Sequence, residues 1–302
     1  MKEVIVTGAN GFIGSQLIMK LIDSDVDIVA IDISFLHSRL PESAHITRIE
    51  SSVDDSLINK IPMGCYDAFY HLAWRGVNGE EKADPFVQIS NIKMAIDCAN
   101  ICKQLNVKKL LCAGTVAENA VYSLSDLSVT TGGMMYGVAK HSCHFMLETY
   151  CKNICLPLVW MQFSNIYGVG NKTGNIVSYT LTQLLAGQEA TFGPALQPYD
   201  FIYVEDLLVA IVRLGNVETS LSTYFIGSGK PRILKDYLAR IGEIVGTPNK
   251  LCLGIRPDDG IRYSMNMFDT KQLQDTIGDY VSTDFDMGIV KTIKWMKSLS
   301  KG

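Results

Sequence analysis

Three glycines near the start of the chain constrain its fold more than any other feature. They are Gly8, Gly11 and Gly14, and they separate two apolar segments whose hydrophobic residues recur at different spacings. Residues 3–7 are mostly branched and apolar, which predicts a short buried strand, whereas the apolar residues after Gly11 recur at helical spacing. The glycines therefore occupy a strand-to-helix turn, where a backbone can approach a ligand closely and a helix N-terminus can receive a phosphate.

Strand-like and helix-like segments alternate through the first half of the sequence. Further strands are expected at residues 26–32, 45–50, 66–73, 107–114 and 156–165, and long helices at 84–105 and 134–153. This alternation predicts right-handed crossovers and a parallel, doubly wound sheet. We therefore expect an α/β protein with a Rossmann-type domain at 1–165. A smaller C-terminal lobe at 166–302 follows, with some segments that return to the first domain.

Composition excludes several classes of partner. Charged residues make up 19% of the 302, and the net charge is −4, so no basic field is available for nucleic acid or an anionic membrane. No apolar segment approaches the roughly 18 residues of a membrane span, and the N-terminus does not resemble a signal peptide. We expect a soluble, cytoplasmic protein.

The eight cysteines are scattered through apolar segments. Cys98 and Cys102, and likewise Cys151 and Cys155, stand four apart on expected helices. Neither pair has the second CxxC or the histidine partners of a zinc site, so we predict reduced thiols and no metal.

Asp32 ends the second expected strand and gives the glycine turn a more specific meaning. A carboxylate there is placed to accept hydrogen bonds from the adenosine ribose hydroxyls, and it would repel a 2′-phosphate. The spacing is GxxGxxG rather than GxGxxG, but the context predicts a dinucleotide site and favours NAD. NADP stays an alternative because Arg39, in the following loop, could reach a phosphate.

Tyr136 and Lys140 stand four apart on an expected helix, so their side chains share one face. A tyrosine with an ordinary pKa near 10 needs about 4 kcal/mol to ionise at pH 7, at about 1.36 kcal/mol per unit. A neighbouring ammonium and a positive nicotinamide can supply that energy. Thr115, after the strand at 107–114, supplies a hydroxyl that can bind the reacting oxygen and orient or pass the proton. These residues predict a hydride-transfer site.

His141, Cys143 and His144 follow Lys140 directly. Helical positions one to three apart do not produce a nucleophile, a base and an orienting group, so we interpret these side chains as packing residues.

Motifs along almost the whole chain resemble one family in its order. They are Gly8-Ala9-Asn10-Gly11-Phe12-Ile13-Gly14, Asp32, His71-Leu72-Ala73, Tyr136-Gly137-Val138-Ala139-Lys140, Asn165-Ile166-Tyr167-Gly168, Asp200-Phe201-Ile202-Tyr203-Val204-Glu205-Asp206 and Arg256-Pro257-Asp258-Asp259. The chain resembles the extended short-chain dehydrogenases/reductases, in their nucleotide-sugar epimerase/dehydratase branch. The resemblance implies an NAD(P)-dependent enzyme, a C-terminal lobe for a nucleoside diphosphate sugar, and a homodimer formed through the helices at 84–105 and 134–153.

The resemblance also implies a cofactor site. Its members are Gly8, Gly11, Phe12, Ile13, Gly14, Asp32, Ile33, Ser52, Val53, Leu72, Ala73, Trp74, Tyr136, Lys140, Phe163 and Ile166. Within this set, Ser52 and Val53 line the adenine pocket, whereas Phe163 and Ile166 hold the nicotinamide. The segment from Leu72 to Trp74 passes the pyrophosphate and ribose.

Substrate contacts follow from the resemblance in the same way. The set is Thr115, Glu118, Asn165, Asn175, Ile176, Tyr199, Arg256 and Asp259. Asn165, Asn175 and Ile176 should contact the diphosphate and sugar. Arg256, whose guanidinium matches a phosphate, should bind one, and Asp259 should contact the nucleoside ribose. Tyr199 departs from the family, which often has an arginine there, so a stacking ring replaces a charge contact.

The residues after Thr115 bear on the reaction. Val116 and Ala117 stand where dehydratases of this family need an acid and a base, so dehydration is not expected. Glu118 is similar to a glutamate of some 4-keto-6-deoxy-sugar reductases, and our first expectation is a 4-ketoreductase of an NDP-4-keto-6-deoxyhexose. The alternative is an NAD-dependent NDP-sugar 4-epimerase, which Asp32 favours because one retained NAD serves both half-reactions. A distant alternative is a non-catalytic NAD-sensing protein, although such proteins usually lack the Tyr or the Lys.

Overall fold

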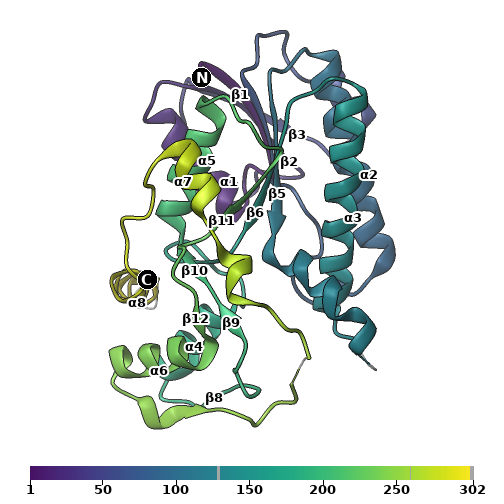
Figure 1. Cartoon of the computed structure of the whole chain (residues 1–302). Coiled ribbons are helices and arrows are strands. Elements are labelled where there is room, and N and C mark those ends of the chain that lie inside the picture. The colour runs from purple at the N-terminus through teal and green to yellow at the C-terminus, as the bar shows by residue number, and fades with distance from the viewer. Residues whose placement is uncertain (128–129, 259, 300–302) are drawn as a thin grey trace. The chain divides into compact units, whose positions relative to one another are not determined.

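A computed structural model describes residues 1–127, 130–258 and 260–299 (Figure 1). Its central element is a seven-stranded sheet in the order β11-β6-β5-β4-β1-β2-β3. The strands are β1 (Glu3–Thr7), β2 (Asp27–Asp32), β3 (Ile46–Glu50), β4 (Ala68–His71), β5 (Leu110–Thr115), β6 (Leu158–Phe163) and β11 (Thr223–Ile226). The sheet is parallel, and the predicted α/β fold of Rossmann type is confirmed.

Strand order places the ligand-binding edge of the sheet. β1 pairs with β2 on one side and with β4 on the other, so the chain winds outward twice from β1 in opposite directions. Such a reversal opens a crevice at the carboxyl ends of the central strands, which is where open α/β sheets bind ligands. The glycine turn follows β1 directly and therefore lies at this edge.

Helices cover both faces of the sheet. The main ones are α1 (Phe12–Ile22), α2 (Pro85–Gln104), α3 (Gly132–Asn153) and α5 (Val204–Asn216). Figure 1 shows α2 and α3 side by side on one face, with α1 and α5 on the other. α2 begins where the sequence predicts: Pro85 is its first residue, and the Asp84 carboxylate accepts the Phe86 N–H at 2.8 Å.

Further helices and strands complete the fold. They are β7 (Asn165–Tyr167), α4 (Ile176–Leu185), β8 (Ala190–Thr191), β9 (Pro198–Tyr199), β10 (Phe201–Tyr203), β12 (Arg232–Ile233), α6 (Leu234–Val245), β13 (Leu251–Cys252), α7 (Lys271–Ile277) and α8 (Phe285–Leu299), with 3₁₀ segments η1 (Asp55–Asn59), η2 (Glu80–Lys82), η3 (Val116–Asp126), η4 (Pro248–Lys250) and η5 (Met265–Phe268). One expected strand is divided: the segment 156–165 ends as β6 at Phe163, and Asn165 begins β7, which pairs with β10.

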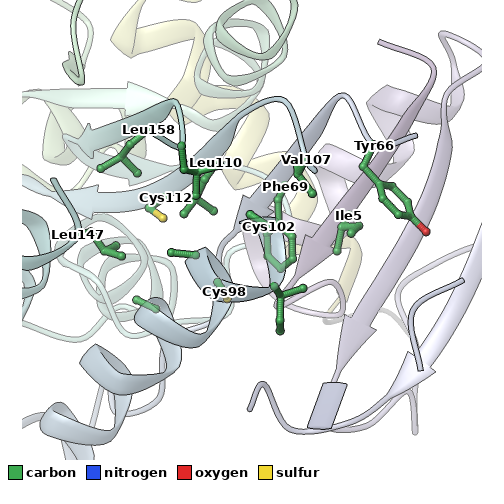
Figure 2. Close-up of a cluster of buried hydrophobic side chains, with 14 of the residues drawn as sticks. Ile5, Tyr66, Phe69, Cys98, Cys102, Val107, Leu110, Cys112, Leu147 and Leu158 are labelled. Carbon is green, nitrogen blue, oxygen red and sulfur yellow. The ribbon is translucent and has the colours of Figure 1, made fainter. Parts of the chain in front are cut away.

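The chain divides into two compact units. The first comprises Met1–Val121, Gly132–Gln162 and Leu208–Tyr224, and the second comprises Tyr122–Thr131, Phe163–Leu207 and Phe225–Gly302. The core of the first unit packs strand residues such as Ile5, Phe69 and Leu110 against α2, where Cys98 and Cys102 face them (Figure 2). All eight cysteines are free. In the described part of the chain, no helix has both the length and the apolar character that crossing a membrane requires.

His71, the last residue of β4, is buried in this core with 3% of its surface exposed. Its Nδ1 lies 2.9 Å from the Thr7 hydroxyl oxygen and 3.3 Å from the Cys98 sulfur. Burial, with a smaller contribution from the Lys140 charge, lowers the pKa of His71 to about 3. The folded protein therefore keeps this imidazole neutral at pH values where the unfolded chain binds a proton.

This difference predicts an acid-sensitive fold. The unfolded chain takes up the proton near pH 6.5 and the folded chain near pH 3, so this contribution to stability is lost as the pH falls below 6.5. At pH 5 the loss is about 2 kcal/mol. Between pH 7 and pH 5, wild type should lose about that much more unfolding free energy than His71→Gln, measured by urea denaturation.

His37→Asn is the matched control, because His37 is exposed and Asn tolerates its positive φ of 56°. This variant should follow wild type. Equal losses in wild type and His71→Gln would contradict the prediction.

Candidate active site

The glycine turn is shaped by backbone at each of its three glycines. Gly8 has a φ of +69°, and a Cβ there would lie 2.8 Å from the Ala73 nitrogen. A Cβ on Gly11 would lie 3.0 Å from the Gly8 carbonyl oxygen, and one on Gly14 only 2.1 Å from it. Gly11 is the N-cap of α1 and supplies no side-chain cap, so the first N–H groups of the helix are left for a ligand. A pyrophosphate fits this arrangement.

Asp32 faces the same turn from the end of β2. One carboxylate oxygen accepts the Asn10 N–H and the other accepts the Ile33 N–H, each at 2.8 Å. Each carboxylate oxygen can accept a further hydrogen bond, which leaves room for ribose hydroxyls. The Asn10 side chain in turn accepts the Arg39 N–H at 2.9 Å, so the loop that carries Arg39 is tied to the glycine turn. The residues present therefore fit the adenosine side of NAD.

The other predicted cofactor residues lie around the same strand ends or in the second unit. Leu72 donates its N–H to the Thr7 carbonyl at 3.2 Å, and Ser52 donates its hydroxyl to Asp54 at 2.6 Å. Val53 packs against the core of the first unit, and Phe12 and Ile13 form the first turn of α1. Ile33 is 80% exposed. Phe163 and Ile166 belong to the second unit, and their contacts with nicotinamide stay predictions.

The three predicted catalytic residues come together in the first unit. Thr115 ends β5, and its hydroxyl lies near the Tyr136 phenol, whose pKa it lowers. One turn further along α3, the Lys140 ammonium donates to the Ala113 carbonyl at 2.6 Å. Trp74 covers both: its ring centroid lies 3.6 Å from the Lys140 nitrogen and 6.2 Å from the Tyr136 ring centroid, edge to face.

Burial sets the charge state of this cluster. It raises the pKa of Tyr136 above its usual range, an effect that the Thr115 hydroxyl opposes and the nearby Glu118 carboxylate reinforces. Burial also lowers the pKa of Lys140 to about 8, against the raising effect of Cys143, Glu118 and Cys112. At pH 7 the cluster therefore holds a neutral phenol beside an ammonium. That pair suits transfer of a proton to or from a substrate oxygen.

Glu118 lies elsewhere than the sequence led us to expect. Its exposed fraction is 1%, and its carboxylate accepts the Thr115 N–H at 2.7 Å and the Trp160 indole N–H at 3.1 Å. Nδ1 of His144 lies 3.2 Å from the second oxygen. A carboxylate enclosed in this way is not accessible to a sugar, so we assign Glu118 a role within the protein in place of a substrate contact. His144, interpreted from the sequence as a packing residue, is one of its hydrogen-bond partners.

Lys82 was not found by sequence reasoning. It ends η2, is half-buried, and its ammonium lies 5.2 Å from the Tyr136 ring centroid. The neighbouring Glu81 pairs with Arg75 instead. Ala83 contacts Gly132 at the start of α3, and this contact fixes η2 beside the catalytic helix. No local sequence pattern predicts such a contact, because Lys82 stands in a charged stretch that indicates a solvated loop.

The predicted substrate residues belong to the second unit, apart from Thr115 and Glu118. Ile176 and Arg256 line one cavity of about 240 Å³. Arg256 donates to the Thr191 hydroxyl at 3.0 Å and to the Tyr179 hydroxyl at 2.7 Å, and its guanidinium stacks over the Tyr179 ring at 4.9 Å. A cation held at a cavity wall in this way can receive a phosphate.

Three other predicted substrate residues are partly engaged by the fold. The Asn175 side chain caps α4 by accepting the Ser178 N–H at 2.8 Å, and its amide donates to the Ile166 carbonyl. Asn165 donates to the Asp200 carbonyl at 3.1 Å. The Tyr199 ring packs against Phe201 and Tyr263. Asp259 lies outside the described residues.

In the part of the chain that is described, no three His, Cys, Asp or Glu side chains are grouped as a metal site requires.

A family model described as the NAD dependent epimerase/dehydratase family matches residues 4–227. The chain belongs to this family. It is 22% identical to a putative UDP-glucose 4-epimerase of Methanocaldococcus jannaschii, over 98% of both chains. It is 26% identical to a dTDP-4-dehydro-6-deoxyglucose reductase of Escherichia coli, over 96% of both chains.

Solved structures agree on the fold. The UDP-glucose 4-epimerase of Thermotoga maritima, solved with UDP-glucose, superposes with a TM-score of 0.82 at 21% identity and covers 99% of both chains. The Bordetella bronchiseptica enzyme WbmF in complex with NADH superposes with a TM-score of 0.81 at 25% identity, covering 99% of this chain and 93% of that one. The predicted family, the NAD cofactor and the enzymatic nature of the chain are confirmed, as a nucleotide-sugar epimerase, dehydratase or reductase.

The glycine turn predicts the effect of one added methyl group. In a helix, Ala is favoured over Gly by about 1 kcal/mol, but in Gly14→Ala the Cβ meets the Gly8 oxygen at 2.1 Å. Relief of that overlap moves the turn and costs about 1–3 kcal/mol. We expect a net loss of unfolding free energy by urea denaturation and weaker NAD binding by calorimetry.

Gly174→Ala is the control, because a Cβ at Gly174 meets nothing within 4 Å and the residue has no positive φ. It should leave NAD affinity unchanged. A Gly14→Ala protein that binds NAD as tightly as wild type would refute the role of the turn.

Proposed function

We propose that the protein is an NAD-dependent 4-epimerase of a nucleoside diphosphate sugar. The observation that carries the proposal is the group of Thr115, Tyr136 and Lys140 at the carboxyl edge of the sheet, in which Lys140 is buried while Thr115 and Tyr136 are partly exposed. When bound, NAD supplies the group that accepts a hydride from C4 of the sugar and returns it. The residues of the chain have to accept the proton of the C4 oxygen and return it.

Tyr136 is the residue proposed to move that proton. As a phenolate it takes the proton of the C4 hydroxyl and becomes the neutral phenol, which returns the same proton to the carbonyl oxygen when the C4 hydroxyl forms again. The Thr115 hydroxyl, which lies near the phenol, orients the sugar oxygen. The Lys140 ammonium favours the ionised phenol by its charge, and Trp74 covers both groups so that this charge acts in a medium of low dielectric.

Two observations favour an epimerase over a reductase. One sequence argument for a reductase was the likeness of Glu118 to a glutamate of such enzymes, with its carboxylate expected to contact the sugar, and that carboxylate is buried. Asp32 disfavours a 2′-phosphate, and a retained NAD serves an enzyme that removes and returns one hydride. The 4-ketoreductase of an NDP-4-keto-6-deoxyhexose is the second candidate, favoured by the likeness to the E. coli reductase.

We further propose that the second unit binds the diphosphate through Arg256. The support is the cavity that Arg256 and Ile176 line, together with the hydroxyl groups that hold the guanidinium in place. A phosphate oxygen is the acceptor that a guanidinium fork matches best. The roles proposed from the resemblance for Asn165, Asn175, Tyr199 and Asp259 complete this part of the proposal.

The deciding experiment measures cofactor and product together. Purified protein is denatured and the released NAD(H) quantified, while native protein is incubated with UDP-glucose, UDP-N-acetylglucosamine and their C4 epimers. Near-stoichiometric NAD with interconversion of one epimer pair supports the epimerase. Loss of absorbance at 340 nm only when external NADH or NADPH meets a dTDP- or GDP-4-keto-6-deoxyhexose would establish the reductase in its place. Bound NAD without turnover of any nucleotide sugar would instead support a non-catalytic NAD-sensing protein.

Tyr136→Phe should then lower kcat for the active substrate by about 10²–10⁴, the range for loss of a positioned acid–base group. KM should change little, because the ring and its contact with Trp74 stay. Tyr150→Phe is the matched control: it stands on the same helix, and its hydroxyl bonds Asn100 instead of the cluster. Full activity of Tyr136→Phe would exclude the proposed proton transfer.

We also propose a homodimer through α2 and α3. These helices pack against each other, yet they leave Phe86 80%, Ile89 61%, Phe145 52% and Met146 52% exposed. Burial of such a face on a second copy removes apolar surface from water. Light scattering should give twice the chain mass of 33.3 kDa, and Phe86→Glu with Ile89→Glu should give the single mass. A wild-type protein at the single mass would remove this proposal.

A further inference from the structure

Glu118 closes the turn on which Thr115 depends. Its carboxylate reaches back from the start of η3 to the Thr115 N–H at 2.7 Å. The Thr115 hydroxyl accepts the Ala117 N–H at 3.2 Å. The direction of the Thr115 side chain is therefore set within its own turn, and the backbone of that turn is held by a charged group.

Hydrogen-bond donors and free space surround the Glu118 carboxylate. The Trp160 indole N–H donates at 3.1 Å to both oxygens, and the Gln162 amide lies 3.5 Å from one of them. Gly114 leaves the necessary space, because a Cβ there would lie 2.2 Å from the Trp160 nitrogen and 2.8 Å from a Glu118 oxygen. Several donors around one buried carboxylate are what a retained negative charge requires.

His144 links this carboxylate to the catalytic helix. Its Nδ1 lies 3.2 Å from Glu118, its Nε2 lies 2.8 Å from the Thr223 hydroxyl, and its ring stacks on Trp160 at 4.8 Å between centroids. Tyr136, Lys140 and His144 stand four residues apart in turn, so they form one stripe along α3.

The charges that face Glu118 can be named for each element packed against it. α3 contributes Tyr136, Lys140, Cys143 and His144, whereas β6 contributes only the neutral Trp160 and Gln162. Lys140 is the fixed cation of this group. Its ammonium lies 5.8 Å from the Trp160 ring centroid, and the indole N–H of the same ring donates to Glu118.

We propose that Glu118 is a positioning residue of the active site, which is held by Trp160 and His144, fixes Thr115 through its backbone N–H, and supplies a buried negative charge to the site of the Lys140 ammonium. The role in turnover rests on the proposed function. The charge effect does not, because it concerns Lys140 in the protein itself.

Glu118→Gln is the main test, because it keeps the size of the side chain and removes its charge. Loss of a neighbouring anion destabilises the charged form of Lys140, so its titration midpoint moves to lower pH. The midpoint is measured by NMR on protein that carries lysine labelled with ¹³C at Cε, with Lys140→Met to assign the resonance. We expect wild type near the pKa of about 8 that burial sets, and Glu118→Gln about one unit lower.

The pH profile of turnover gives the second readout. If the ammonium is required, the alkaline limb of kcat moves to lower pH by the same amount in Glu118→Gln. At pH 7 kcat falls about tenfold, since Thr115 also loses its fixed direction, while KM stays within a factor of about three. Glu148→Gln is the matched control: Glu148 lies on α3 and bonds Lys152 and Ser222, so both readouts should stay as in wild type.

The outcomes separate the two proposals. A shifted Lys140 midpoint without turnover of any nucleotide sugar in wild type supports the charge role and counts against the proposed function. Normal turnover in wild type, with midpoint and alkaline limb unchanged in a folded Glu118→Gln, overturns the role of Glu118 alone. Should Glu118→Gln fail to fold by circular dichroism, His144→Phe replaces it. This variant keeps the stacked ring and removes one donor, so the less compensated carboxylate should raise the Lys140 midpoint, and a lowered or unchanged midpoint overturns the proposal.

Discussion

Parallel pairing of β1, β4 and β5 determines where every other part of the first unit lies. The registers pair Thr7 with His71 and His71 with Cys112, so β1 and β4 end at the same level of the sheet and β5 continues beyond them to Thr115. Gly8 therefore meets the backbone after β4, and Thr115 ends β5 at the same edge. A shift by one residue in either pairing would turn each strand over and separate these groups. Because the buried side chains are apolar on both faces of the sheet, the close fit of their shapes, and not their polarity, opposes such a shift.

The chemistry at this edge depends on low dielectric as much as on position. A phenol and an ammonium in water would titrate close to their ordinary values and would barely affect each other. Beneath Trp74 and against Trp160, burial shifts the pKa of Tyr136 upward and that of Lys140 downward, so the neutral form of each group gains relative to its charged form. Aromatic cover thus makes the protonation of an ordinary (i, i+4) pair on a helix depend on the charges that bind beside it.

Local sequence signals predicted the parts of the molecule that local sequence determines. The strand–glycine–helix turn, the Asp84–Pro85 start of α2 and the (i, i+4) spacing of Tyr136 and Lys140 each depend on residues close together in the chain. Strand positions followed from apolar runs, although β6 ends earlier than expected and gives way to β7. These signals, with the motif order, sufficed for the fold and for the cofactor.

Positions set by tertiary packing lay beyond such signals. Lys82 comes near Tyr136 only because η2 packs on the start of α3, and Asn175 turns out to cap α4 with the side chain expected to meet substrate. The buried state of Glu118 depends on Trp160 and His144, which stand far from it in sequence. An acidic residue directly after a strand is expected to be exposed, because a glutamate is rarely buried without partners. The local sequence does not show the partners of Glu118.

That burial matters for the choice of reaction. A carboxylate that contacts a sugar can select one keto-sugar and one face of it, and so favours a one-way reduction. A carboxylate enclosed by Thr115, Trp160 and His144 acts only on the protein and leaves the sugar face of the cluster to Thr115 and Tyr136. An epimerase needs such freedom, because the keto-sugar has to present both faces in turn to the same hydride. For the proposed function, the internal placement of this one charge is the observation that favours an epimerase over a reductase.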